Sequence, residues 1–109
     1  MRRLVVVLLA VGAVVALPAG AATPKLLGTV GPGFTITLTK KPTKAGKYTL
    51  VVSDKSSIHN FHLTGPGVNV KTSVAATGSK TFRIALKKGK YTFVCDPHAS
   101  TMRGTFRIR

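Results

Sequence analysis

Acidic residues are almost absent from this 109-residue chain, in which Asp54 and Asp96 stand against 17 Lys and Arg, for a net charge of +15. Two isolated carboxylates and no nucleophile elbow leave Cys95 and His98 without the partners that a hydrolase nucleophile and its base need. We therefore predict that the chain is not an enzyme. The positive charge favours an anionic partner, such as membrane phosphates, an acidic polymer or an acidic protein.

Long hydrophobic runs are also missing. The longest covers the 14 residues from Leu4 to Leu17, which is shorter than the roughly 18–20 residues that a membrane span needs. Arg2 and Arg3 precede the run, and Pro18 and small residues follow it. This order is typical of a secretory signal peptide. We predict a signal peptide at 1–22, with retention as a short anchor as the alternative, and a single exported domain at 23–109.

Cysteine occurs once, as Cys95, so no internal disulfide is possible. An unpaired thiol in an oxidising compartment is a liability unless something occupies it. A buried, inert cysteine is one explanation. Its neighbourhood favours another, because His98 and Met102 follow within the run Cys-Asp-Pro-His-Ala-Ser-Thr-Met, and Met102 is the only Met after the predicted signal peptide.

Helical periodicity is absent after Thr23, and short alternating runs take its place. Apolar residues alternate with polar ones at Phe34–Leu38, Phe82–Leu86 and Tyr91–Cys95, and Gly or Pro residues separate such runs. Alternation of this kind indicates strands with one buried face. Further strands are expected at 48–52, at 59–63, at an edge position within 68–74, and at 102–108. Seven or so strands predict an all-β sandwich or small barrel.

Strand alternation also places the sulfur and imidazole groups. Cys95 is the last inward residue of its strand and Met102 the first inward residue of the next, so the two sulfurs should face each other with His98 between them. A thiolate, imidazoles and a thioether form a ligand set for copper, whereas zinc gains little from the thioether. His59 shares the inward face of Phe61 and can supply a second imidazole, while His62 points the other way.

The segment Gly89–Ile108 resembles the C-terminal copper loop of the cupredoxins, specifically of the plastocyanin-like group, and His59-Asn60 is similar to their upstream His-Asn pair. The likeness covers about Gly31 to Arg109. It implies a Greek-key β-sandwich of about seven to eight strands with one type 1 copper, serving one-electron transfer. Carried over, the equatorial ligands would be His59, Cys95 and His98, the weak axial ligand Met102, and the supporting hydrogen-bonding residue Asn60.

Other functions remain open from the sequence. The same ligands could serve a copper carrier or store without redox turnover, and a metal-free polyanion-binding sandwich is also possible. Nucleic acid is a poor candidate partner because no basic helix or aromatic series is visible. The redox partner is not identifiable, and we expect a monomer.

Strand direction makes an anionic membrane or cell-envelope surface the more natural partner. It puts Lys87, Lys88 and Lys90 at the end opposite Cys95, together with Lys40, Lys41, Lys44 and Lys47.

Overall fold

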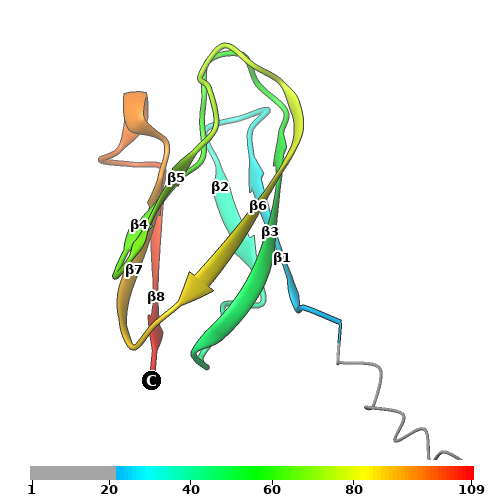
Figure 1. Cartoon of the computed structure of the whole chain (residues 1–109). Coiled ribbons are helices and arrows are strands. Elements are labelled where there is room, and N and C mark those ends of the chain that lie inside the picture. The colour runs from blue at the N-terminus through cyan, green and yellow to red at the C-terminus, as the bar shows by residue number, and fades with distance from the viewer. Residues whose placement is uncertain (1–21) are drawn as a thin grey trace, which may run out of the picture.

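Eight strands in two sheets make up the described part of the chain, residues 22–109, in this computed structural model (Figure 1). The strands are β1 (Lys25–Val30), β2 (Ile36–Thr39), β3 (Gly46–Asp54), β4 (His62–Gly65), β5 (Val68–Lys71), β6 (Gly78–Leu86), β7 (Gly89–Val94) and β8 (Arg103–Ile108). One 3-10 turn, η1 (Asp96–His98), lies between β7 and β8. The predicted signal peptide lies outside the described residues except for Ala22. Within residues 22–109, no helix is long and apolar enough to cross a membrane.

The two sheets are connected by repeated crossovers. The first has the order β2-β1-β3-β6 and the second the order β5-β4-β7-β8. β1 pairs with β3 in parallel, whereas the other neighbouring strands are antiparallel. The chain changes sheet after β3, after β5 and again after β6, which gives the β-sandwich that the sequence predicts, and β5 takes the edge position expected for it.

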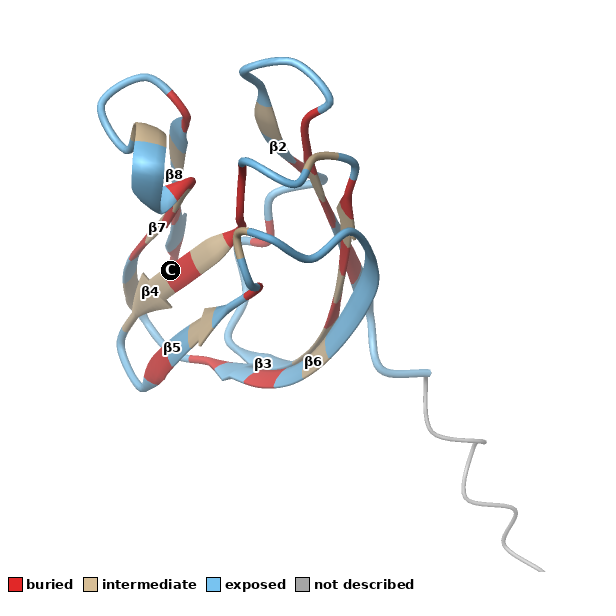
Figure 2. Ribbon diagram, turned by 90° about the horizontal axis from the view of Figure 1, so that it is seen from above, coloured by how far each residue is buried: buried red, intermediate tan, exposed pale blue. Residues whose placement is uncertain are grey.

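The core lies between the two sheets and is built from the inward residues of each. Leu50 and Val52 of β3 are fully buried, as are Leu63 of β4 and Tyr91 of β7. Alternation along β3 and β7 separates these positions from half-buried ones, and Figure 2 shows buried and more exposed residues alternating along the ribbon. Two stacked aromatic pairs join strands of the second sheet and the segment before it: Phe61 with Phe93, and Tyr91 with Phe106.

Two sequence expectations differ from the structure at the start of the domain. β1 was not predicted, although Leu26 and Val30 alternate as buried residues within it. Phe34 was expected on a buried strand face, but it lies before β2 with 65% of its surface exposed. The reason is a turn: Gly31 has φ of 72° and its N–H donates to the carbonyl of Thr35 at 2.9 Å, so the segment between them projects from the sheet.

Strand direction divides the sandwich into two ends. One end, named the site end here, carries residues 31–35, residues 55–61 and the η1 turn with the loop that follows it. The opposite end carries the β2–β3, β4–β5 and β6–β7 turns, because β3 pairs Gly46 with Leu86 and β7 pairs Gly89 with Ile108. Segments that are far apart in sequence therefore converge at the site end (Figure 1).

Candidate metal centre

Three side chains from three segments converge at the site end. His59 lies before β4, Cys95 directly follows β7, and His98 closes the η1 turn. Their donor atoms lie within 4.8 Å of one another. The His59 Nδ1 and His98 Nδ1 atoms are 3.1 Å apart, and each lies 3.6 Å from Cys95 Sγ. The sequence assigns four residues to the copper site. The structure brings the donor atoms of three of them, His59, Cys95 and His98, into one group.

The donor set suits copper. Atoms placed about 2.1 Å from a common centre in a trigonal arrangement are about 3.6 Å apart, close to the separations of the three donors. The group contains one sulfur and two imidazole nitrogens and no carboxylate, which is the donor chemistry of blue-copper sites. Cys95 and His59 are fully buried and His98 is half-buried. An ion here would be screened from solvent on the sulfur side and reachable through the His98 ring.

Met102 occupies the position that strand alternation predicts. Its side chain is 1% exposed and directly precedes β8. Backbone hydrogen bonds close the loop around it: the Met102 N–H donates to the carbonyl of His98 at 2.8 Å, and the Cys95 N–H donates to the carbonyl of Met102 at 3.0 Å. These bonds hold the Cys-to-Met loop in a compact turn. The backbones of Cys95 and Met102, which start and end the loop, therefore lie side by side.

Asn60 joins the two strands that carry the donors. Its side-chain carbonyl accepts the Asp96 N–H at 2.8 Å, and its amide donates to Asp96 Oδ2 at 2.8 Å. Since Asn60 follows His59 and Asp96 follows Cys95, this pair of bonds ties one donor-bearing segment to the other. Burial of Asp96 acts to raise its carboxyl pKa, but hydrogen bonds from Asn60 and His62 and the positive charges of His62 and Lys71 outweigh it, so the pKa is lowered.

Asp54, the other acidic residue of the chain, lies close enough to His59 to feel the charge of its imidazole. It ends β3, is 4% exposed, and accepts the Ser56 N–H at 2.9 Å through Oδ1. Burial raises its pKa, and the Ser56 hydrogen bond and the charge of His59 oppose the rise. Among the described residues, neither Asp54 Oδ2 nor His59 Nε2 has a hydrogen-bond partner, although both are buried. The sequence prediction gave Asp54 no place at the site, although Asp54 continues the alternation of buried Leu50 and Val52 along β3, which was the signal that could have found it.

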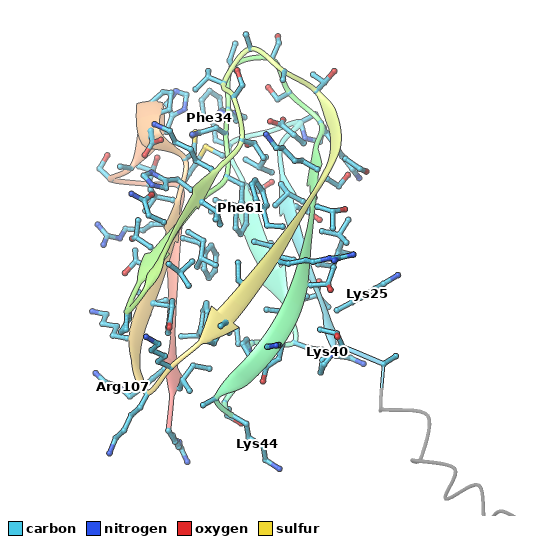
Figure 3. All side chains as sticks on the ribbon, in the orientation of Figure 1. Lys25, Phe34, Lys40, Lys44, Phe61 and Arg107 are labelled. Carbon is cyan, nitrogen blue, oxygen red and sulfur yellow. The ribbon has the colours of Figure 1, made fainter. Side chains whose placement is uncertain are left out.

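Phe34 covers the two imidazoles from outside. Its ring meets those of His59 and His98 edge-on, each at a centroid distance of 5.1 Å. Figure 3 shows the ring at the site end, far from Lys44 and Arg107. Because the two imidazoles also meet edge-on at 4.9 Å, the three rings form a closed aromatic cluster. The turn that displaced Phe34 from its expected strand therefore places it over the candidate metal centre.

His62 lies apart from the three donors, as the sequence indicated. It begins β4, is half-buried, and its ring faces Asp96 rather than Cys95. The outer surface around His98 is formed by exposed Pro97, Ala99 and Ser100.

Comparison with known proteins identifies a family and a set of similar structures. Residues 29–109 match the family described as copper binding proteins, plastocyanin/azurin family. A structure of reduced rusticyanin superposes with a TM-score of 0.62 at 19% identity, covering 82% of this chain and 81% of that one. A chain of a heme-copper terminal oxidase dimer matches with a TM-score of 0.56 at 21% identity, over 78% of this chain and 63% of its own length. A search of curated proteins found no match.

Proposed function

The chain belongs to the plastocyanin/azurin family of copper-binding proteins, the cupredoxins, and on that premise we propose that it is an exported one-electron carrier with a type 1 copper. The observation that carries the proposal is the triangle of His59 Nδ1, His98 Nδ1 and Cys95 Sγ, in which only His98 is partly exposed. One copper per chain corresponds to this one group. In the proposed assignment the three donors would hold the copper, Met102 would be a fourth, weaker ligand, and Asn60 would hold the loops.

The protein's own residues would keep the site rigid and give it one opening. When bound, copper supplies a one-electron couple between Cu(I) and Cu(II). The donor-bearing segments are tied by the Asn60–Asp96 hydrogen bonds and by the backbone bonds of the Cys-to-Met loop, so they need not rearrange between oxidation states. Phe34 would shield part of each imidazole from water, and half-buried His98 would offer the shortest path to a partner protein. No substrate is transformed in this scheme, so the protein is a carrier and not an enzyme.

The opposite end would serve as an anchor. The exposed cations of this end, together called the basic end, are Lys40, Lys44, Lys47, Lys87, Lys88, Lys90, Arg107 and Arg109. Figure 3 shows Lys44 and Arg107 on this side of the molecule. Lys41 is not included, because its ammonium lies 5.8 Å from the centre of the Phe93 ring. We propose that the basic end holds the protein to an anionic envelope surface while His98 faces away from it, since clustered charge of this kind attracts anionic lipid.

Reconstitution with Cu(II) tests the ligand assignment. A short thiolate–copper bond should give an intense charge-transfer band in the visible, which Cys95→Ser should abolish. Thr64→Ala, on β4 but outside the donor group, is the matched control and should keep the band. Absence of the band in the parent protein would refute the type 1 assignment. Stopped-flow electron exchange with a redox protein then separates an electron carrier from a copper store, because a store would hold copper without fast exchange.

A further inference from the structure

His62 belongs to a hydrogen-bonded chain that the copper ligands do not use. Its Nδ1 lies 2.8 Å from Asp96 Oδ1 and its Nε2 lies 2.6 Å from Asn69 Oδ1. Asn69 is on β5, His62 begins β4 and Asp96 begins η1. The imidazole therefore connects two strands of the second sheet to the turn that follows Cys95.

The two oxygens of the Asp96 carboxylate are divided between two donors. Oδ1 faces His62, and Oδ2 accepts from the Asn60 amide at 2.8 Å. The Asp96 N–H also donates to Asn60 at 2.8 Å, which fixes the backbone next to Cys95. His62 is thus the outer half of a clamp of which Asn60 is the inner half.

Hydrogen-bond chemistry fixes which atom donates. A carboxylate oxygen only accepts, so His62 Nδ1 must carry the proton of the bond to Asp96. If Asn69 Oδ1 is the partner of Nε2, both ring nitrogens donate and the ring is an imidazolium. If the Asn69 amide is flipped so that its NH₂ group faces Nε2, that nitrogen accepts and the ring is neutral. In both cases the donor to Asp96 is kept. The clamp therefore does not depend on the charge state of His62.

Stability does not account for this arrangement. The Asp96 side chain is 42% exposed and that of His62 is 20% exposed, and ion pairs in such positions contribute little to folding because solvent screens them. Lys71, opposite His62 in the register of β4 and β5, adds a second positive charge to the surroundings of Asp96. What the clamp does control is the position and the compensation of a negative charge one residue from Cys95.

We propose that His62 is a positioning residue of the copper site, acting through Asp96 to hold the Cys95 segment against Asn60 and, by its Nδ1–H donor, to offset part of the carboxylate charge beside the thiolate. This rests on the proposed function, in which His59 and Cys95 bind copper. Hydrogen-bonding partners one step removed from a metal typically change its affinity by 10–100-fold. Because His62 acts through a further residue, its effect should fall at the lower limit of this range.

His62→Ala in the full chain tests the proposal with and without metal. In the metal-free protein, hydrogen exchange of the Asp96 amide should become several-fold faster, because its partner Asn60 loses the support of the clamp. In the copper protein, the reduction potential should fall, since an uncompensated carboxylate near the site favours Cu(II). The dissociation constant for Cu(I), measured by competition with a chelator, should rise about tenfold, in keeping with the fall in potential. Thr64→Ala, two residues along the same strand face, is the matched control and should change none of these.

Two more variants identify Asp96 as the intermediary. His62→Asn places an amide donor near the position of Nδ1 and should restore slow exchange at Asp96. In an Asp96→Asn background, His62→Ala should no longer lower the potential, because the two residues act as one unit. An equal fall in potential in that background, or unchanged exchange in His62→Ala, would overturn the proposal. A parent protein without the visible band would overturn the copper assignment instead, while the exchange measurement would still report on the clamp.

Discussion

Gly104 is the position at which one added methyl group should do most damage near the site. It lies opposite Phe93 in the pairing of β7 and β8. A Cβ on Gly104 would lie 2.2 Å from Phe93 Cζ and 2.6 Å from Phe93 Cε2, whereas ordinary contact begins at 3.4 Å. The ring cannot move freely, because it is 2% exposed and stacks on Phe61 at a centroid distance of 5.6 Å. Either the ring or β8 must shift by about 1 Å.

Overpacking of this kind costs about 1–3 kcal/mol. For a domain of this size, a loss of about 2 kcal/mol lowers the melting temperature by about 10 °C. We therefore expect Gly104→Ala to melt about 10 °C below the parent in calorimetry of the metal-free protein. The same sample loaded with copper should show an altered visible band, because Phe93 precedes Cys95 by two residues on the same face of β7.

The control for this prediction is Gly33→Ala. Gly33 has no neighbouring atom within 4 Å of an added Cβ, and its φ lies outside the left-handed region. This change should alter stability by no more than about 0.5 kcal/mol. Phe93→Leu should partly rescue Gly104→Ala by making room for the methyl group. If Gly104→Ala melts with the parent, or if the two glycine variants melt alike, the steric reasoning is wrong.

Three further predictions follow from the site and from the charge distribution. Copper at a thousandfold excess over its dissociation constant should stabilise the fold by about 4 kcal/mol and raise the melting temperature by about 15–30 °C; equal melting of the saturated and metal-free forms would contradict a buried site. Because the Asp96 pKa is lowered in the folded protein, its stabilising effect is present above the unfolded pKa and is lost as pH falls through the folded pKa. In urea titrations, the free energy of unfolding of Asp96→Asn should therefore fall less steeply than that of the parent as the pH is lowered from about 5 to about 2. The difference should be less than about 1 kcal/mol, because the Asp96 carboxylate is partly exposed. A variant of the basic end in which Gln replaces Lys87, Lys88 and Lys90 should sediment less with anionic vesicles at low salt, and its copper spectrum should be unchanged. Unaltered sedimentation would assign the charge to solubility.

Alternation predicted the site side chains that lie on or beside regular strands. Tyr91, Phe93 and Cys95 are all buried, as a period of two requires, and Met102 is buried at the start of the next strand. Such positions depend on local periodicity and on burial of one sheet face, both of which a sequence displays. His59 was assigned inward by the same reasoning, and it is fully buried although β4 begins only at His62.

Contacts across sequence separations of 30 residues or more could not be predicted in this way. The bonds of Asp96 to Asn60 and to His62 join residues 36 and 34 positions apart, and they arise only when β4 and β7 pair. Phe34 was misplaced because a hydrogen-bonded turn at Gly31 overrides the alternation that follows it. β1 was missed because exposed Leu27 and buried Gly28 obscure the alternation of its sequence, although it pairs with both β2 and β3.

The unequal ends of the sandwich give the molecule an electric dipole moment. Both acidic side chains lie at the site end, where they offset part of the charge of nearby Lys55, Lys71 and Arg103, whereas the opposite end carries no Asp or Glu side chain. An external field exerts a torque on such a distribution before any contact is made, so an approaching molecule is rotated as well as attracted. Replacing a charge at either end should therefore change the fraction of collisions that arrive with His98 facing the partner, even where the strength of binding stays the same.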